Sequence, residues 1–285
     1  MSPLALTLVL VGAFAHAAWN LLAKTAGSGA QFVWLTALAG TILYLPPAAV
    51  ALAYAPGSFS PTALLFMAVS GALHAAYFVL LQRAYRNGDL SLVYPLARGT
   101  GPLLATAAAI ALLGERPSAI ALLGGAMIVL AVLSLAGSAS GSGLSTRAGV
   151  LYALLTGTCI AAYTLWDKQA VAAQGLSPIV YYWGTMLANA AVLTPLAAAR
   201  RDAVARVWRE YRRQVLGVAV LSPLAYVLVL FALAIAPVYY VAPAREVSIL
   251  IGAVLGAQVL SEGDTGRRLL AAGGIVLGVV ALALG

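Results

Sequence analysis

Residues 214–244 read QVLGVAVLSPLAYVLVLFALAIAPVYYVAPA, 31 consecutive residues without a charged side chain. About 20 apolar residues cross a lipid bilayer once, so the stretch exceeds one crossing. Arg245 and Glu246 follow at once, and the next charge downstream is Glu262. The stretch therefore predicts membrane-spanning helices, with adjacent opposite charges set inside one of them.

The composition of the whole chain supports the same class. Hydrophobic residues make up 63% of the 285 residues and charged residues 8%, against roughly 45–50% and 25% in soluble domains. A β-barrel would show alternating residues in segments of about 10, whereas these apolar runs are continuous. We therefore predict an all-α integral membrane protein.

The net charge of +8 does not indicate a nucleic-acid partner, because the basic residues gather in a few short loops, as membrane topology requires. The single cysteine, Cys159, excludes an internal disulfide. AFA at 13–15 resembles a signal-peptidase site. No basic residue precedes it, however, and the run stays uncharged to Lys24, so a first membrane helix is the better interpretation.

Charges, prolines and glycine clusters divide the chain into ten predicted spans, five on each side of the Gly/Ser-rich segment GSASGSGLS at 137–145. We expect a first repeat at 1–137, a linker at 138–146 and a second repeat at 147–285. The spans are 3–23, 31–54, 62–82, 90–113, 118–136, 148–167, 177–199, 213–236, 238–261 and 268–284.

The two halves resemble each other in sequence. HAAWNLLAK at 16–24 aligns with IAAYTLWDK at 160–168, and a constant shift of 147 aligns 93–137 with 240–284 without a gap. This shift places Arg98 on Arg245 and Glu115 on Glu262, which is informative because charges are scarce. Five spans per half make the second half enter from the opposite side. The pattern predicts an inverted-topology repeat, which many transporters use for alternating access.

Loop charges predict the orientation. Twelve basic residues lie on the side reached after odd-numbered spans and two, Arg116 and Lys168, on the other side. The positive-inside rule makes the first side cytoplasmic and both termini external. The twelve are Lys24, Arg83, Arg86, Arg147, Arg200, Arg201, Arg206, Arg209, Arg212, Arg213, Arg267 and Arg268.

Arg98 and Arg245 are the candidate substrate-binding cations. Each lies seven or eight residues inside its span, roughly 10–12 Å deep at ~1.5 Å per residue. A guanidinium facing lipid costs at least ~2.5 kcal/mol, so both should face a polar cavity or a partner. The alternative for Arg245 is a salt bridge with Glu246, although adjacent helical residues point about 100° apart. Arg98 has no acid in its span, which favours the cavity.

Prolines and glycines surround both arginines and predict interrupted helices at matching places, a sign of a mid-membrane site. Packing kinks are the alternative. The candidate gating or kink residues are Pro95, Gly99, Pro102, Pro243 and Glu246.

Aromatic and polar residues within the spans complete the predicted cavity, because rings with a polar edge suit an amphipathic substrate. Interfacial anchoring is the alternative for such rings and is the interpretation for Tyr54, Trp208 and Tyr211. The candidates are His16, Trp19, Asn20, Tyr77, Gln82, Tyr94, Tyr163, Trp166, Asn189 and Ser248.

The sequence gives little support for metal binding or for catalysis. His16 and His74 have no acidic or cysteine partner at ligand spacing, so we expect no metal and no cofactor. HExxH and GxSxG are both absent and the chain has eight carboxylates, which argues against an enzyme. GAVLG at 252–256 and GIVLG at 274–278 predict helix packing. Glu115 and Glu262 each follow a span, as loop or gate residues near the membrane surface.

These features resemble the drug/metabolite transporter superfamily, specifically its ten-span EamA-type exporters. The likeness rests on LLGERPSAIALLGGAMIVLAVL at 112–133, AFAHAAWNLLAK at 13–24 and LSEGDTGRRLLAAGGIVLGVV at 260–280. Within that family the YddG-like aromatic amino acid exporters are the nearest likeness. Four-span relatives exchange protons through a membrane glutamate. The first span here has none, which puts proton coupling in doubt. Family members are usually drawn with cytoplasmic termini, whereas the loop charges of this chain predict external termini.

The resemblance implies export of amino acids or similar small amphipathic metabolites through a central cavity of a bacterial-type inner membrane protein. The alternatives are an exporter or flippase of lipid-linked or nucleotide-linked sugars, whose phosphates favour a denser arginine cluster, and a membrane-embedded enzyme. Five plus five spans supply both halves of a site, so we expect a functional monomer among membrane lipids.

Overall fold

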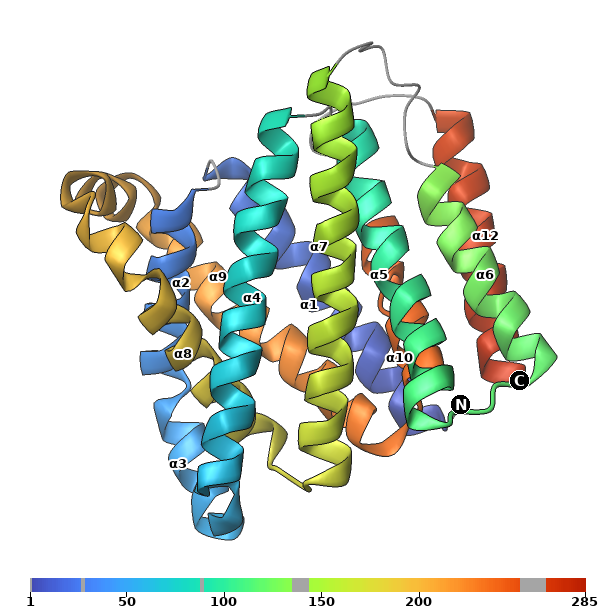
Figure 1. The fold of residues 1–285 in the computed structure, drawn as a ribbon, viewed down its shortest axis with the longest axis horizontal. Helices are drawn as coiled ribbons and strands as arrows, with labels where there is room; N and C mark the ends of the chain where they lie inside the picture. The colour runs from blue at the N-terminus through green and yellow to red at the C-terminus, as the bar shows by residue number, and fades with distance from the viewer. Residues whose placement is uncertain (1, 27–28, 88–89, 135–143, 252–264) are drawn as a thin grey trace.

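The computed structural model describes residues 2–26, 29–87, 90–134, 144–251 and 265–285. These segments are helical, with turns between them and no strand (Figure 1). The predicted all-α class is therefore confirmed. The helices run side by side as one bundle, which is the arrangement that satisfies every backbone N–H and C=O group within lipid.

The helices of the first half follow the predicted spans closely, with one bend. The second span is divided into two helices that meet at 50°, where Pro46 and Pro47 occupy the first turn of the new helix and their missing N–H groups cost no bond. The helices are α1 (Pro3–Thr25), α2 (Ala30–Leu43), α3 (Leu45–Tyr54), α4 (Pro61–Asn87), α5 (Leu90–Leu113) and α6 (Ala119–Ser134).

The second half departs from prediction in two places. Its eighth span joins a basic N-terminal segment into one long helix with a kink at Tyr211 (φ −124°, ψ 22°). Its ninth span, expected to be continuous over 238–261, breaks at Arg245 and Glu246, and 252–261 lies outside the described residues. The helices are α7 (Leu144–Lys168, followed by a π turn at Gln169–Ala173), α8 (Pro178–Ala198), α9 (Arg201–Ile235), α10 (Val238–Ala244) and α12 (Thr265–Leu284).

Within these segments, five helices are long and apolar enough to cross a membrane, and six if α2 and α3 form one bent span. The five are Pro3–Ala23, Pro61–Asn87, Leu92–Leu113, Arg147–Ala173 and Arg201–Ile235. Two further apolar helices, Ala119–Ser134 and Leu270–Leu284, are shorter.

The two halves interlock in a symmetrical manner. α1 of the first half packs on α9 of the second, and α7, the counterpart of α1, packs on α4, the counterpart of α9. α2 likewise packs on α9 as α8 packs on α4, and α6 pairs with its own counterpart, α12. Exchanging the halves thus reproduces the same contacts, as a pseudo-two-fold repeat requires.

Glycines allow the closest of these approaches. A Cβ on Gly124 of α6 would lie 2.7 Å from the Gly278 carbonyl oxygen of α12, and a Cβ on Gly278 would lie 2.7 Å from that of Gly124. The packing role predicted for GIVLG is therefore confirmed. GAVLG at 252–256 and Glu262 lie outside the described residues.

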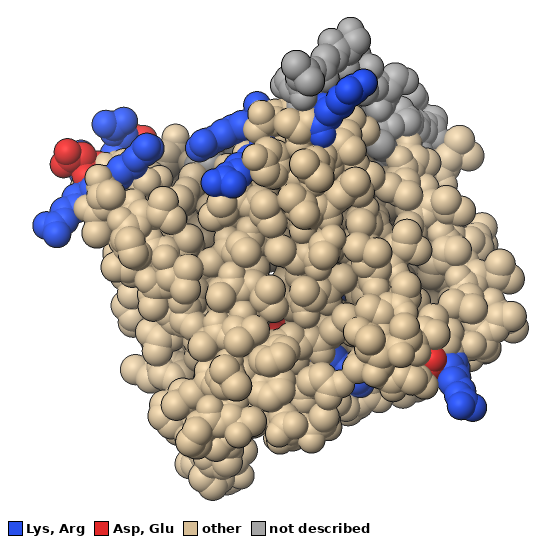
Figure 2. All heavy atoms as spheres, in the orientation of Figure 1, with Lys and Arg blue, Asp and Glu red and all other residues tan. Residues whose placement is uncertain are grey.

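Charge separates the two ends of the bundle. Both termini lie at one end (Figure 1), and most of the exposed Lys and Arg shown in Figure 2 lie along the opposite edge. The described basic side chains there include Arg83, Arg86 and Arg147. They also include Arg200, Arg201, Arg206, Arg209, Arg212 and Arg213, on a segment that we call the basic arm (residues 200–213).

Candidate substrate-binding site

The break in the ninth span brings charges from both halves together. Arg98 Nε of α5 lies 2.9 Å from Glu246 Oε2, and Arg245 Nε lies 3.9 Å from Glu246 Oε1. Relative exposure is 5% for Arg98, 7% for Arg245 and 1% for Glu246. We call these three residues the arginine cluster. Their contact is an ion pair by distance, without a well-oriented hydrogen bond at Arg98 Nε or at either Glu246 oxygen.

Proline explains the break locally. Pro243 lacks the N–H that would bond to the carbonyl four residues earlier, at Tyr239. The next turn tightens to bonds spanning three residues, from Glu246 N–H to Pro243 O (3.0 Å) and from Ser248 N–H to Arg245 O (3.2 Å). The interrupted helix predicted around Pro243 is therefore present.

α5 behaves differently from that prediction and remains helical through Pro95 and Pro102. A helix tolerates an internal proline when it bends slightly around the lost bond. Pro102 deprives the carbonyl of Arg98 of its usual helical donor. Gly99 lies so close to α6 that a Cβ would meet Leu133 at 2.8 Å, so its small size serves helix packing in this structure.

The partner of Arg98 corrects one inference from the sequence. Its own span has no acid, which favoured a cavity-facing guanidinium without a partner, but the acid comes from the opposite half. Glu246 lies nearer to Arg98 than to its neighbour Arg245, because adjacent side chains diverge around a helix. Ser248, a predicted site residue, accepts from Arg98 Nη2 at 3.5 Å.

Arg245 retains free binding capacity. Its Nη2 donates to the Tyr163 hydroxyl at 3.0 Å, while its buried Nη1 has no hydrogen-bond partner among the residues that the structure describes. Its Cζ lies 5.9 Å from the centre of the Tyr163 ring and 6.0 Å from that of Tyr226, within cation–π range. Two guanidinium groups face one carboxylate here, so the arginine cluster carries one excess positive charge.

Aromatic rings from four helices surround Arg245. His74 of α4 stacks on Tyr163 of α7 at 4.2 Å and meets the edge of Tyr226 of α9 at 5.3 Å, and Tyr182 of α8 lies 4.9 Å from Tyr226. Tyr77, on α4, meets the edge of Tyr163 at 6.1 Å. The prediction included Tyr77 and Tyr163. It missed Tyr182 and Tyr226 and considered His74 only as a metal ligand.

The remaining predicted site residues do not all join this group. His16 lies within electrostatic reach of Arg98 and Arg245 and packs against Trp19 at 4.9 Å, and Asn20 donates to the His16 carbonyl of its own helix. Trp19 packs on a core cluster around Phe32 and Val215, between α1, α2 and α9.

Trp166 points toward α4, where it donates to the Phe66 carbonyl at 2.9 Å and packs on the Phe66 ring at 4.5 Å. Asn189 lies at the contact between α4 and α8, and its Oδ1 is buried without a partner. Tyr94 and Gln82 are half-buried, and Tyr94 lies within electrostatic reach of Arg98 and Glu246.

Asp167 is a functional candidate that the sequence reasoning missed. It is 0% exposed and accepts from three hydroxyls: Ser70 (2.7 Å), Tyr181 (2.6 Å) and Tyr226 (2.6 Å). We call these three donors the hydroxyl cage. Asp167 is absent from the predicted site residues. The available signal was its position inside a predicted span, where a carboxylate is costly.

Two charged side chains hold helix termini at the end of the bundle away from the basic edge. Glu115 accepts from the first N–H groups of α10, Val238 (2.8 Å) and Tyr239 (3.1 Å). Lys168 donates to the last carbonyls of α9, Leu233 (2.7 Å) and Ala236 (3.0 Å). Each charge thus stabilises the helix terminus of opposite polarity.

Local sequence places Glu115 there. Gly114 ends α5 in the left-handed region (φ +68°), which glycine favours at helix ends, and the Glu115 N–H then bonds back to the Ala109 carbonyl at 3.2 Å. The Gly-Glu step therefore stops one helix and caps the start of another. This agrees with the expectation that Glu115 is a loop residue.

Burial differs along the bundle. Residues 18–23 of α1 and 76–82 of α4 are half-buried at every described position, whereas every side chain of α10 is buried. Glu115 and Lys168 line an open pocket of about 450 Å³ together with Gln169 and Pro237.

Comparison with known proteins agrees with this architecture. The family model described as the EamA-like transporter family matches residues 3–137 and again residues 147–284. A crystal structure described only as that of a protein superimposes with a TM-score of 0.79 at 17% identity, covering 98% of this chain and 96% of that chain. A likeness at this identity shows the fold alone. A comparison with curated proteins finds no match. Since the family model covers nearly the whole chain in two copies, the protein is a membrane transporter that belongs to the EamA-like family.

Proposed function

We propose that this transporter exports small amphipathic metabolites that carry a carboxylate, foremost aromatic or other apolar amino acids, by alternating access. The observation that carries the proposal is the guanidinium of Arg245, whose buried Nη1 has no partner and whose neighbours are tyrosine rings. A substrate carboxylate would satisfy Nη1 with a charge-assisted hydrogen bond and neutralise the excess charge of the arginine cluster.

The rings supply selectivity for the rest of the substrate. His74, Tyr163, Tyr182 and Tyr226 offer stacking faces and polar edges beside one cation. An aromatic or aliphatic side chain would bury apolar area there, while its backbone groups reach the polar edges. Ligand sites of this kind are mainly apolar with a few placed polar groups.

The repeated architecture supports alternating access. The arginine cluster joins both halves at a helix break, the place where transporters of inverted-repeat design bind substrate. With the basic edge cytoplasmic by the positive-inside rule, both termini lie outside. We assign the protein to a bacterial-type inner membrane, functioning as a monomer without a catalytic reaction.

Carriers of nucleotide-linked or lipid-linked sugars are the second candidate, and only the excess positive charge favours them. A diphosphate carries more negative charge than one unpartnered guanidinium neutralises. Amino acids therefore fit the arginine cluster better.

Counterflow in proteoliposomes tests the proposal. Vesicles loaded with unlabelled L-phenylalanine should accumulate labelled L-phenylalanine, and Arg245→Gln should reduce the initial rate at least about tenfold, the effect of one charge-assisted bond. Arg116→Gln, which changes an exposed arginine next to Glu115, is the control. Saturable counterflow of a nucleotide sugar but not of any amino acid would favour the second candidate.

A further inference from the structure

Asp167 is a buried carboxylate without a cationic partner. Among the residues that the structure describes, no Lys, Arg or His nitrogen lies within 4.0 Å of it. Lys168, the next residue, points to the carbonyls at the end of α9 instead. Only the hydroxyl cage stabilises a negative charge there, and an unpaired ion in a water-free interior is costly.

The hydroxyl cage also accommodates the protonated, neutral form of Asp167. The hydroxyl of Ser70 both donates and accepts, so it can rotate to receive a hydrogen bond from a protonated Asp167. The two tyrosine hydroxyls can go on donating to the carboxyl oxygens. The cage therefore fits both protonation states, which a cationic partner would not.

Titratable groups face Asp167 from every helix around it. α4 contributes His74, α8 contributes Tyr181 and Tyr182, and α9 contributes Tyr226. α7 itself carries Tyr163, which lies between His74 and Arg245. Arg245 lies within electrostatic reach of His74. Among the described residues, the groups around Asp167 thus include several proton donors and, beside His74, the guanidinium of Arg245.

A chain of donors leads to the carboxylate. His74 Nδ1 donates to the Ser70 carbonyl at 2.9 Å and lies 3.4 Å from Ser70 Oγ, which donates to Asp167 at 2.7 Å. Because Nδ1 carries the proton, Nε2 of the neutral imidazole is free to accept one. His74 is half-buried whereas Asp167 is fully enclosed. The chain therefore runs from the accessible ring group to the enclosed acid.

Tyr226 links this chain to the arginine cluster. Its hydroxyl donates to Asp167 at 2.6 Å, and its ring lies 6.0 Å from the Cζ of Arg245. A change in the charge of Asp167 would alter the strength of that hydrogen bond, and with it the position of a ring that contacts the arginine. Proton binding and substrate binding thus share one side chain.

We propose that Asp167 is the proton-binding site of this transporter and exchanges one proton for one substrate molecule. The inference rests on the proposed function. In one step hydronium gives a proton to His74 Nε2 and leaves as water, the Nδ1 proton moves to Ser70 Oγ, and the Ser70 hydroxyl proton moves to the carboxylate. Asp167 becomes neutral, Ser70 regains its hydroxyl, and His74 is left as the other neutral tautomer. After the two halves have moved and His74 faces the other side, the same steps in reverse return the proton from Nε2 to water and restore the first tautomer.

Proteoliposomes containing an internal pH indicator test the exchange. An imposed L-phenylalanine gradient should move protons in the opposite direction through the wild-type protein. Asp167→Asn should retain counterflow within about threefold while proton movement falls to the level of empty vesicles. Asp202→Asn, an exposed acid in the first turn of α9, is the matched control and should behave as wild type.

The outcomes separate the two proposals. Wild-type phenylalanine flux without proton movement, or an Asp167→Asn protein that still moves protons, overturns the proton site and leaves the proposed function standing. Absence of any amino acid flux in the wild type overturns both. If Asp167→Asn does not fold, Ser70→Ala decides, because it breaks the donor chain and should slow proton movement at least about tenfold while counterflow continues.

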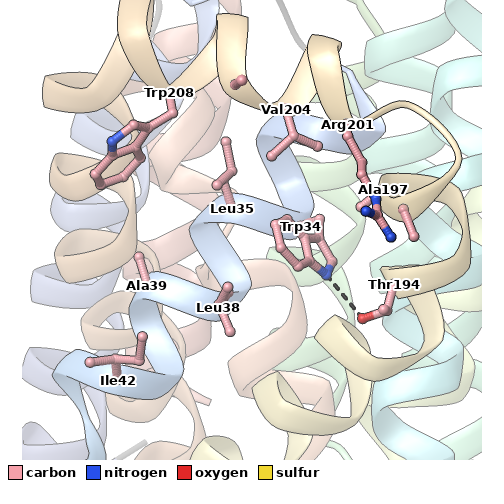
Figure 3. Close-up of a pocket in the computed structure, with 12 residues that line it drawn as sticks. Trp34, Leu35, Leu38, Ala39, Ile42, Thr194, Ala197, Arg201, Val204 and Trp208 are labelled. Atoms are coloured by element: carbon pink, nitrogen blue, oxygen red, sulfur yellow. Dashed lines mark hydrogen bonds between the residues drawn. The ribbon is translucent and has the colours of Figure 1, made fainter.

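A separate observation concerns the groove between α2 and the basic arm. This groove has a volume of about 570 Å³ and is lined mainly by apolar side chains of α2 and α9, including Trp34, Leu38 and Trp208. Figure 3 shows Trp34 Nε1 bonded to Thr194, at 3.1 Å, and Arg201 beside them at one end of the groove. The groove thus combines an apolar floor with a cationic end.

Charge complementarity indicates its occupant. The basic arm begins at the groove and carries six arginines, all exposed, and Trp208 is 42% exposed at its edge. Basic residues next to an apolar surface attract anionic lipid, each contributing about a fivefold gain in affinity, and Trp favours headgroup depth. We infer that the groove holds an acyl chain of an anionic phospholipid whose phosphate contacts Arg201.

Native mass spectrometry of the full-length protein with matched-chain phosphatidylglycerol and phosphatidylcholine tests this inference. Phosphatidylglycerol should be retained preferentially, and Arg201→Gln should weaken its retention about fivefold. Trp208→Ala should weaken both lipids. Arg147→Gln, exposed at the start of α7, is the control. Equal retention of the two lipids, or an unchanged Arg201→Gln protein, would overturn the assignment.

Discussion

Arg98 Nε lies 2.9 Å from Glu246 Oε2, so a buried ion pair joins the two repeats at the break in the ninth span. Arg98 belongs to α5 of the first repeat and Glu246 follows α10 of the second, so the pair links the two repeats where helical structure is interrupted. An unpaired charge buried at this place would be costly, so we expect the stability of the protein to depend on the pair.

Neutralising Glu246 should destabilise the protein. Glu246→Gln leaves two buried guanidinium groups without an anion, and breaking a buried pair in this way costs about 3–5 kcal/mol. Thermal unfolding in detergent measures the loss. The double variant Arg98→Met with Glu246→Gln should be less destabilised than the sum of the two single variants, and strict additivity would show that the pair is not coupled.

Tyr163→Phe should weaken substrate binding. The change removes the acceptor of Arg245 Nη2, and a hydrogen bond to a charged group contributes about 1.5–3 kcal/mol. Without it the guanidinium loses its orientation between the rings, so the apparent Kd for substrate should rise about tenfold. Tyr152→Phe, near Arg83 at the basic edge, is the control. Unchanged affinity in Tyr163→Phe would remove Tyr163 from the site.

Gly278→Ala should disrupt the packing of α6 on α12. The added Cβ would lie 2.6 Å from Ile128 Cγ1 and 2.7 Å from the Gly124 carbonyl, and such overpacking costs about 1–3 kcal/mol. Gly273→Ala meets nothing within 4 Å and should be neutral or stabilising by up to about 1 kcal/mol, since alanine favours the helix. Comparing their melting temperatures tests the sign of both effects.

Glu115→Leu should loosen the start of α10. It removes both side-chain acceptors there, a capping loss of about 0.5–2 kcal/mol. Faster thiol labelling of a cysteine introduced at Val238 would report the loosened contact, with Arg116→Leu as the control. Equal labelling rates in the two variants would show that Glu115 does not hold the start of α10 in place.

Much of the fold follows from the sequence, because long uncharged runs permit few alternatives in lipid. Helix boundaries such as Leu113 follow from glycine at the next position. The break at Arg245 and the kink at Tyr211 are harder to predict. Both depend on how the neighbouring helices compensate for backbone hydrogen bonds that are lost there. The periodicity of the sequence carries no information about those contacts.

The site was predictable only in part. Arg98, Arg245 and Tyr163 stood out through scarce charge and repeat symmetry, and the structure brings them together. Glu246 as the partner of Arg98 required the packing of the two halves. Asp167 was overlooked because it lies at the end of a predicted span next to Lys168, and only the structure shows that the two side chains bond to different partners.

The central claim is that Arg245 recognises a carboxylate, and binding of matched ligands tests it most directly. Calorimetry with L-phenylalanine and phenethylamine, which lacks the carboxylate, should show about a ten- to hundredfold preference for the amino acid in the wild type. In Arg245→Gln the preference should fall to near unity. Equal affinity of the two ligands for the wild-type protein would contradict the account.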